Sequence, residues 1–168
     1  MQLRGKGRAY VTEVVARADA IRYSYRLLSY RDRSEKELRE RLGRKGFSEE
    51  TVQQTISHLK DKGFINDIAL ASSLKRSAEE IKLLGTKGVR LFLQHRGLSG
   101  EIIDDILADS DPDEIIRAKK LVDRKLRTME NYSDEEIRKK IWGFLMRKGY
   151  SFDTIRQILK QFKIKEEG

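Results

Sequence analysis

The sequence contains no cysteine, a single proline, two histidines and no long apolar run. Without cysteine the chain has no disulfide and no thiol chemistry, which agrees with a reducing cytoplasm. No stretch approaches the roughly 20 apolar residues of a membrane helix, and the N-terminus shows no apolar segment of a signal peptide. We therefore expect a cytoplasmic protein without membrane attachment. The scarcity of proline and the frequent Ala, Leu, Glu, Lys and Arg favour an all-helical chain.

Catalytic and metal-binding constellations are also scarce. His58 and His95 stand near expected helix ends beside basic residues, and no acid or thiol is placed to complete a triad or a ligand set. Adjacent carboxylates such as Asp104 and Asp105 point in different directions on a helix, so they do not easily share a metal. No motif for nucleotide binding or nucleophilic catalysis occurs. We expect a protein that is not an enzyme and has no cofactor, since a hydrolase or nuclease would need such a set.

A five-residue motif recurs three times in the 168 residues. It reads RKGFS at 44–48, HRGLS at 95–99 and RKGYS at 147–151, so its glycines are 51 and 52 residues apart. Apolar residues at spacings of three and four flank each copy, which predicts a helix on both sides. The glycine fits the left-handed end of one helix, and the serine fits the N-cap of the next. Three unrelated helix-corner-helix pieces are the alternative, but the shared period favours a repeat protein.

The repeat predicts an all-α fold of nine helices, in three tandem three-helix repeats stacked into an elongated, curved body. The expected segments are a basic N-terminal arm at 1–11, repeat 1 at 12–64, repeat 2 at 65–110 and repeat 3 at 111–168. The first helix is expected from Glu13 to Tyr30.

Side chains that cap helices mark several further boundaries. Ser34 with Glu37 and Ser133 with Glu136 fit capping boxes. Asn66 is expected to cap a helix reaching to about Leu84. Further along, Asp111 is expected as a cap before Pro112. Apolar positions including Val14 and Ile81 are expected to be buried, and Gly85 and Gly88 are expected to loosen the entry to the following helix.

The charge of the chain points to an anionic partner. Lys and Arg number 36 against 27 Asp and Glu, a formal charge of +9, which favours a polyanion or an acidic protein surface. Basic residues recur at the same corner of each repeat. Either they form a solvated face, or they form a periodic ridge that contacts phosphates without reading bases. For the second interpretation, exposure and recurrence select Arg22, Arg26, Arg33, Arg39, Arg44, Lys45, Arg90, Arg96, Arg147 and Lys148.

Several segments together resemble a known family. RSEKELRERL at 33–42 is followed by KGF at 45–47, then by GFIND at 63–67, and the later glycines at 85, 97 and 149 keep the spacing. Over residues 14–162 the chain is similar to the RecX-type recombination regulators. It departs from them at Leu70 and Leu74, where aromatic residues are expected, and residues 1–11 have no clear counterpart.

The resemblance implies a non-enzymatic regulator of RecA, built of tandem three-helix repeats. Such a protein lies in the helical groove of the RecA filament on single-stranded DNA and mainly inhibits RecA activity. We expect it to be a monomer that gains affinity from several weak contacts, and direct DNA binding stays open. The competing interpretation is a sequence-nonspecific DNA-binding helical module, similar to a helix-turn-helix, that acts without a recombinase.

Overall fold

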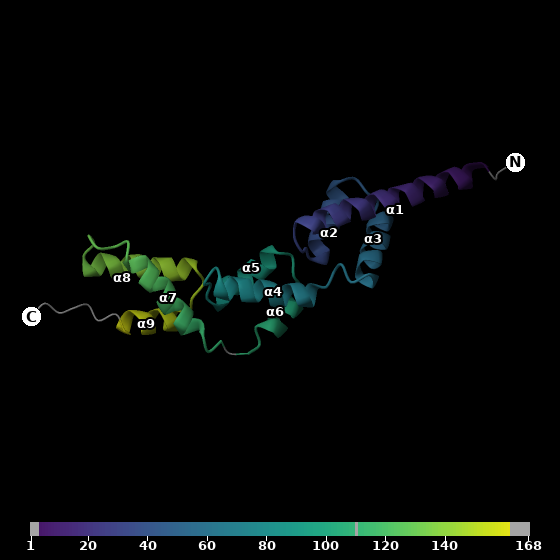
Figure 1. Ribbon diagram of the computed structural model, residues 1–168. Coiled ribbons are helices and arrows are strands. Elements are labelled where there is room, and N and C mark those ends of the chain that lie inside the picture. The colour runs from purple at the N-terminus through teal and green to yellow at the C-terminus, as the bar shows by residue number, and fades with distance from the viewer. Residues whose placement is uncertain (1–3, 110, 162–168) are drawn as a thin grey trace, which may run out of the picture. The chain divides into compact units, whose positions relative to one another are not determined.

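The computed structural model of the protein describes the backbone of residues 4–109 and 111–161, with side chains from residue 13 onward in these ranges. This part of the chain forms nine α-helices and no strand (Figure 1). The helices are α1 (Arg4–Tyr30), α2 (Glu35–Arg44), α3 (Glu49–Asp61), α4 (Asp67–Glu80), α5 (Thr86–His95), α6 (Gly100–Ile106), α7 (Glu114–Leu126), α8 (Asp134–Arg147) and α9 (Phe152–Gln161). The predicted all-α class and three-helix pattern are confirmed. The elongated, curved stacking stays a prediction.

The chain folds as two compact units. Unit 1 holds the described residues up to Leu70 together with Arg96–Ser99. Unit 2 holds Ala71–His95 and the described residues from Gly100 onward. The corner between α5 and α6 thus packs with unit 1. The predicted repeat boundaries at 64 and 110 stay a prediction.

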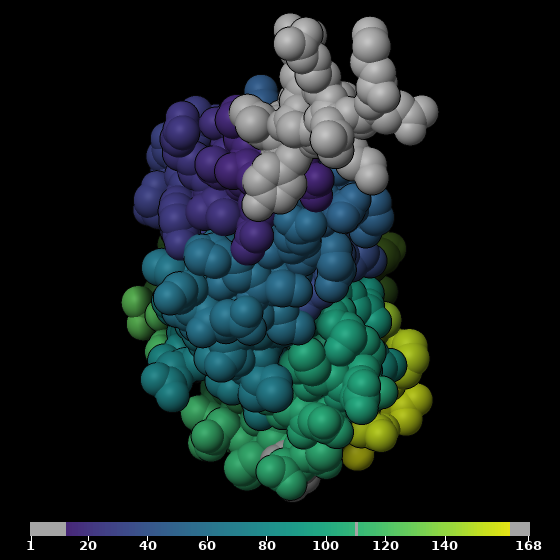
Figure 2. Space-filling view, turned by 90° about the vertical axis from the view of Figure 1, so that its right-hand side faces the viewer, coloured from purple at the N-terminus to yellow at the C-terminus, as the bar shows by residue number. Residues whose placement is uncertain are grey.

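The core of unit 1 lies where α1, α2 and α3 meet. Leu38 and Leu42, one turn apart on α2, are fully buried, and Ile56 of α3 is 1% exposed. Ala20 brings α1 close to both helices, because its small side chain is also fully buried. Figure 2 shows one face of this unit, in purple to blue, where side chains cover the core. Apolar residues at helical spacing therefore drive the packing of unit 1.

Unit 2 has a core among α7, α8 and α9. Ile141 and Leu145 of α8 pack with Ile155 and Ile158 of α9, and all four are 1% exposed or less. Leu83, which follows α4, belongs to the same cluster. The second repeat thus contributes directly to the core of the third, as expected for repeats too small to be stable alone.

Serine N-caps predicted from the sequence are present, at the motif serine Ser48 and at the two expected capping boxes. The hydroxyls of Ser34, Ser48 and Ser133 accept the backbone N–H groups three residues later. Ser133 and Glu136 form a complete capping box. The box predicted at Ser34 is wrong in its second half, because the Glu37 carboxylate binds Arg31 and Arg33 instead.

Two predicted helix boundaries and one predicted cap differ from the structure. Helix α1 begins at Arg4 and not at Glu13, so the arm predicted at 1–11 is helical from Arg4, and its first three residues lie outside the described range. Asp111 does not cap α7, which begins at Glu114, because its carboxylate pairs with the Arg117 guanidinium. The predicted helix end at Leu84 was also wrong, since α4 ends at Glu80.

Several positions expected in the apolar stripes are exposed. Val14 of α1 is 50% exposed, and Ile81, just past the end of α4, is 75% exposed. Helical spacing alone therefore overestimated how far these stripes are covered by neighbouring helices.

Each later corner glycine contacts the start of the second helix in the preceding repeat. In unit 1 a Cβ added to Gly97 would lie 2.6 Å from the Ser34 hydroxyl. In unit 2 a Cβ on Gly149 would lie 2.0 Å from the backbone nitrogen of Gly88. Gly85 N–H donates to the Lys148 carbonyl at 3.0 Å, and Lys87 N–H donates to the Gly149 carbonyl at 3.1 Å. Gly85 and Gly88 therefore permit a tight backbone contact, and the expectation that they loosen this segment was wrong.

Candidate partner interface

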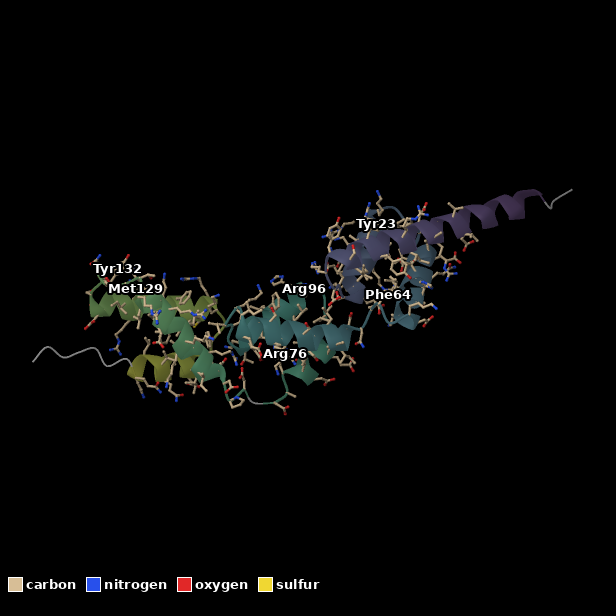
Figure 3. All side chains as sticks on the ribbon, viewed as in Figure 1. Tyr23, Phe64, Arg76, Arg96, Met129 and Tyr132 are labelled. Atoms are coloured by element: carbon tan, nitrogen blue, oxygen red, sulfur yellow. The ribbon has the colours of Figure 1, made fainter. Side chains whose placement is uncertain are left out.

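A hollow of about 430 Å³ lies on unit 1, between α1 and the corner that joins α2 to α3. We call it the unit 1 hollow, and its lining residues are Asp19, Arg22, Tyr23, Arg26, Lys45 and Phe47. The sequence predicted three of these as contact residues. They meet here because Arg22 and Arg26 are one turn apart on α1, and the left-handed Gly46 turns the chain directly after Lys45. Tyr23 marks the position in Figure 3.

The unit 1 hollow combines positive charge with aromatic faces. The guanidinium of Arg26 lies 5.3 Å from the centre of the Tyr23 ring, and the Tyr23 and Phe47 rings are 6.5 Å apart. Arg22 pairs with Asp19 at 3.5 Å, but both side chains are more than half exposed, so this pair contributes little. Three cations against one carboxylate leave the surface positive. Chemically, it suits an anion that carries or adjoins an apolar group.

The corner beside the unit 1 hollow carries Arg44 and Lys45. Both side chains are exposed, as the sequence predicted. Arg44 lies 3.4 Å from Glu40 across one helical turn, with 72% of its side chain exposed. Such a pair breaks readily, so Arg44 remains available to an anionic partner.

Arg33 is not on the surface, and the expectation that it is exposed was wrong. Its side chain is 9% exposed, pairs with the Glu37 carboxylate and donates to the Leu27 carbonyl at 3.2 Å. Burial alone raises the pKa of Glu37, but hydrogen bonding to Arg31 and the charges of Arg31 and Arg33 lower it overall. Arg33 therefore ties the end of α1 to the start of α2.

Arg96 belongs to the same cluster, although it lies 64 residues from its partner in the sequence. It donates from Nη2 to the Asp32 carbonyl at 3.0 Å, and it is half-buried (labelled in Figure 3). Burial and the neighbouring charge of Arg31 lower the pKa of this guanidinium. Its position at the corner of residues 96–99 makes Arg96 a contact within unit 1 in addition to a candidate contact for a partner.

Arg39 and Arg90 face carboxylates instead of open solvent. Arg39 binds Glu35 at 2.9 Å and donates to Gln53 at 2.6 Å. Arg90 pairs with Asp104 across the corner between α5 and α6. Local acids therefore accompany these two cations, and their part in a basic ridge stays a prediction.

The third corner carries Arg147 and Lys148 in unit 2. Arg147 is exposed, whereas Lys148 is partly buried and donates to the Lys82 carbonyl at 3.3 Å. Arg147 lines a second hollow together with Lys125, Lys139 and Lys140 of α7 and α8, which the sequence interpretation missed. The sequence feature that could have indicated this hollow is the adjacent pair Lys139–Lys140, which lies outside the repeated motif.

The described part of the chain offers neither a metal cluster nor a membrane helix. Its residues contain no group of three or more His, Asp or Glu side chains able to hold a metal. None of its helices has the length and apolarity to cross a bilayer. His58 lies 3.2 Å from the Tyr25 hydroxyl, which gives this histidine a structural contact.

Comparison with known proteins gives the family. A model described as the first three-helix domain of RecX matches residues 20–59, and one described as the third matches residues 113–159. The regulatory protein RecX of Trichlorobacter lovleyi is 32% identical over 147 residues, which span 86% of this chain and 96% of that protein. The chain belongs to the RecX family.

Other RecX proteins give the same result. The regulatory protein RecX of Chlorobaculum tepidum is 31% identical over 144 residues, spanning 86% of this chain and 88% of that protein. The crystal structure of RecX from Lactobacillus salivarius has a TM-score of 0.75 at 24% identity, over 88% of this chain and 97% of that one, and shows the same fold. The two RecX domain matches fall inside the predicted first and third repeats.

Proposed function

We propose that this RecX-family chain regulates RecA by binding the RecA filament on single-stranded DNA in its helical groove, and that it mainly inhibits RecA activity. The relatives are named regulatory proteins, which supports regulation without catalysis. The observation that carries the proposal is the unit 1 hollow, where Arg22, Arg26 and Lys45 stand around two aromatic rings. An acidic protein surface or a phosphate backbone matches this chemistry.

The three described corners differ in how free their cations are. Arg26, Arg44 and Lys45 are exposed in unit 1, and Arg147 is exposed in unit 2. Cations that are already balanced, such as Arg90, gain less from a new anion because their present pair must first be broken. The proposed contact set is therefore centred on the exposed residues, and two separate weak contacts on one filament would add by avidity.

Charge reversal at the unit 1 hollow tests the proposal. Arg26→Glu with Lys45→Glu replaces two attractive contacts by repulsive ones, so we expect about tenfold or greater loss of filament inhibition, equivalent to at least ~1.4 kcal/mol. Inhibition of RecA strand exchange measures this, with circular dichroism to verify folding. Lys62→Glu is the matched control, because Lys62 is exposed on the same unit and does not line the hollow. Equal inhibition by all three proteins would remove the hollow from the interface.

The second candidate is a DNA-binding helical module that needs no recombinase. The exposed basic residues favour this candidate, because they can bind the phosphates of DNA without any contact to RecA. A gel-shift titration on bare duplex DNA, compared with binding to assembled RecA filaments at the same salt concentration, separates the two. Preference for the filament supports the regulator, whereas equal or tighter binding to bare duplex supports the module.

A further inference from the structure

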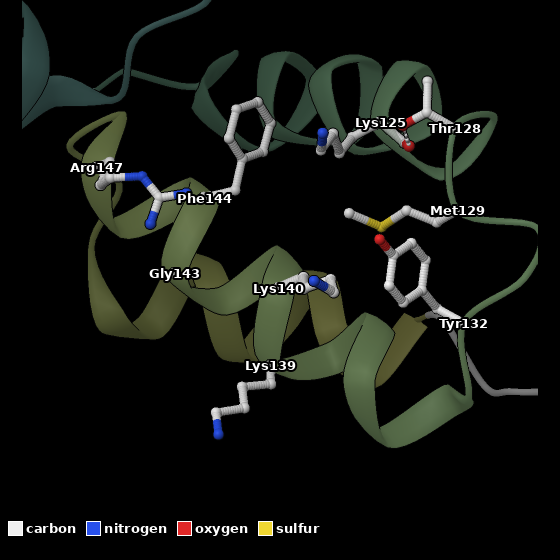
Figure 4. Close-up of a pocket in the computed structure, with 9 residues that line it drawn as sticks. All are labelled: Lys125, Thr128, Met129, Tyr132, Lys139, Lys140, Gly143, Phe144 and Arg147. Carbon is white, nitrogen blue, oxygen red and sulfur yellow. Dashed lines mark hydrogen bonds between the residues drawn. The ribbon is translucent and has the colours of Figure 1, made fainter.

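A second hollow, of about 320 Å³, lies between α7 and α8 in unit 2 (Figure 4). We call it the unit 2 pocket. It is lined by Lys125, Thr128, Met129, Tyr132, Lys139, Lys140, Gly143, Phe144 and Arg147. Four of these side chains are cationic and none is a carboxylate.

The cations of the unit 2 pocket have no acidic partner in an ion pair within the described residues, in contrast to Arg33, Arg90 and Arg117 elsewhere in the chain. Glu136 does act on Lys140, because hydrogen bonding to Ser133 and, more weakly, the charge of Lys140 lower the pKa of this carboxylate. That carboxylate accepts both the backbone N–H and the hydroxyl of Ser133 at 2.9 Å, so it is used in capping α8. The four cations that line the pocket repel each other, because the one carboxylate that acts on Lys140 is engaged in capping, and a bound anion would relieve this repulsion.

Two lysines of the pocket rest on aromatic rings. Lys140 Nζ lies 4.4 Å from the centre of the Tyr132 ring, and Lys125 Nζ lies 5.8 Å from that of Phe144. Figure 4 shows Lys125, Lys140 and Tyr132 around the same space, with Met129 beside the ring. Cation–π contacts at exposed sites are weaker than a charge-assisted bond to a phosphate. A phosphate would therefore draw the ammonium groups away and free the ring faces.

A freed ring face is a stacking platform for a flat base. Tyr132 is 43% exposed, so one side of its ring is accessible without unfolding the pocket. Gly143 has no side chain to fill the α8 side of the pocket. A Cβ at this position would lie 3.3 Å from Arg147 Nη1, which is a tight contact. The volume is at the lower end of the roughly 300–1,000 Å³ range of small-ligand sites, which suits one nucleotide and not a large cofactor.

We propose that the unit 2 pocket binds one nucleoside phosphate, with Lys125 and Lys140 contacting the phosphate and the base lying against Tyr132. The nucleotide is either free or one unit of a single strand, because both present the same phosphate and base. This site goes beyond the proposed function, and it operates without RecA. Its failure would therefore leave the unit 1 interface and filament inhibition untouched.

Direct binding to the full chain tests the pocket. The probes are a fluorescently labelled dT₁₂ oligonucleotide, followed by anisotropy, and ATP and pyrophosphate, followed by calorimetry. The double variant Lys125→Gln with Lys140→Gln is expected to weaken dT₁₂ or ATP binding about tenfold or more. For dT₁₂ the slope of log affinity against log salt should fall by about 0.7, because the two lysines neutralise one phosphate of the single strand. The matched control is Lys87→Gln, since Lys87 also rests on a ring, Phe152 at 5.9 Å, outside the pocket.

A second variant separates a nucleotide site from a general anion site. Tyr132→Leu removes the stacking face and keeps every cation, so it should weaken nucleotide binding several-fold and leave pyrophosphate binding unchanged. Binding of ATP alone or dT₁₂ alone supports the proposal and identifies the source of the nucleotide. The proposal is overturned if neither probe binds at millimolar concentration, if Lys87→Gln weakens binding as much as the double variant, or if Tyr132→Leu has no effect.

Discussion

The three corner glycines share a left-handed backbone in different surroundings. Gly46, Gly97 and Gly149 have φ angles of 93°, 77° and 82°. A Cβ on Gly46 would meet nothing within 4 Å, whereas on Gly97 it would meet a side-chain hydroxyl and on Gly149 the backbone of Gly88. Alanine at each position therefore separates backbone strain from the loss of a contact between repeats.

The expected losses of stability form a series. Gly46→Ala carries only the left-handed penalty, about 1–2 kcal/mol. Gly149→Ala also forces the two loops apart, which breaks the hydrogen bonds from Gly85 to Lys148, from Lys87 to Gly149 and from the Tyr150 hydroxyl to Leu83. At ~0.5–1.5 kcal/mol each, these add about 2–4 kcal/mol.

Gly97→Ala should fall between the other two variants. The added methyl group meets Ser34 Oγ, which belongs to a side chain and can rotate away. Rotation would release the Glu37 N–H that this hydroxyl caps, at a cost of about 1 kcal/mol.

The position of the single tryptophan allows unit 2 to be followed separately. Trp142 packs against the core of α7, α8 and α9, so its fluorescence reports on unit 2, while circular dichroism reports on all helices. For Gly149→Ala we expect the thermal midpoint of unit 2 to fall on the order of 15–30 °C. Hydrogen exchange at the Gly85 and Lys87 amides should accelerate in this variant. Equal losses in all three alanine variants would refute the reasoning, because strain alone would then account for them.

Two further predictions concern pH. Burial raises the pKa of Tyr150 to about 12, so the stability that its neutral form contributes is complete below pH ~10 and decreases by about 2 kcal/mol as the pH rises to 12. Tyr150→Phe should reduce this loss of stability at alkaline pH, as followed by Trp142 fluorescence. The same loss in both proteins would contradict the prediction. The pKa of Glu37 is lowered, against the effect of burial, by Arg31 and Arg33, so its contribution is present above pH ~4.5 and lost on further acidification. Glu37→Gln should destabilise unit 1 at pH 7 by ~1–3 kcal/mol and make its stability less sensitive to acid, as measured by urea unfolding. Equal stability of both proteins at pH 7 would argue against a stabilising Glu37–Arg33 ion pair.

Local chemistry made much of the helical framework predictable. Ser34, Ser48, Ser133 and Ser151 cap their helices because each hydroxyl and the N–H that it binds are only three residues apart. Exposure was likewise predicted correctly for Arg22, Arg26, Arg44 and Lys45. In contrast, Arg33 and Asp111 looked like a surface cation and a cap, and both are used in ion pairs. The side chains of these two residues can contact solvent, the backbone or an opposite charge, and the surrounding helices determine which contact forms.

The amino-acid sequence alone determined that the chain forms helices in repeated units, through its order of apolar residues and its recurring glycine–serine corner. Both features act within a few residues, since helical periodicity and capping are local. Tertiary structure alone decided which cations stay available. Arg90 pairs with Asp104, and Arg96 binds the Asp32 carbonyl across 64 residues, while Lys125 and Lys140 line one pocket that has no carboxylate in its lining. The reason is physical: the free energy of a charge depends on burial and on partners that folding brings from distant parts of the chain.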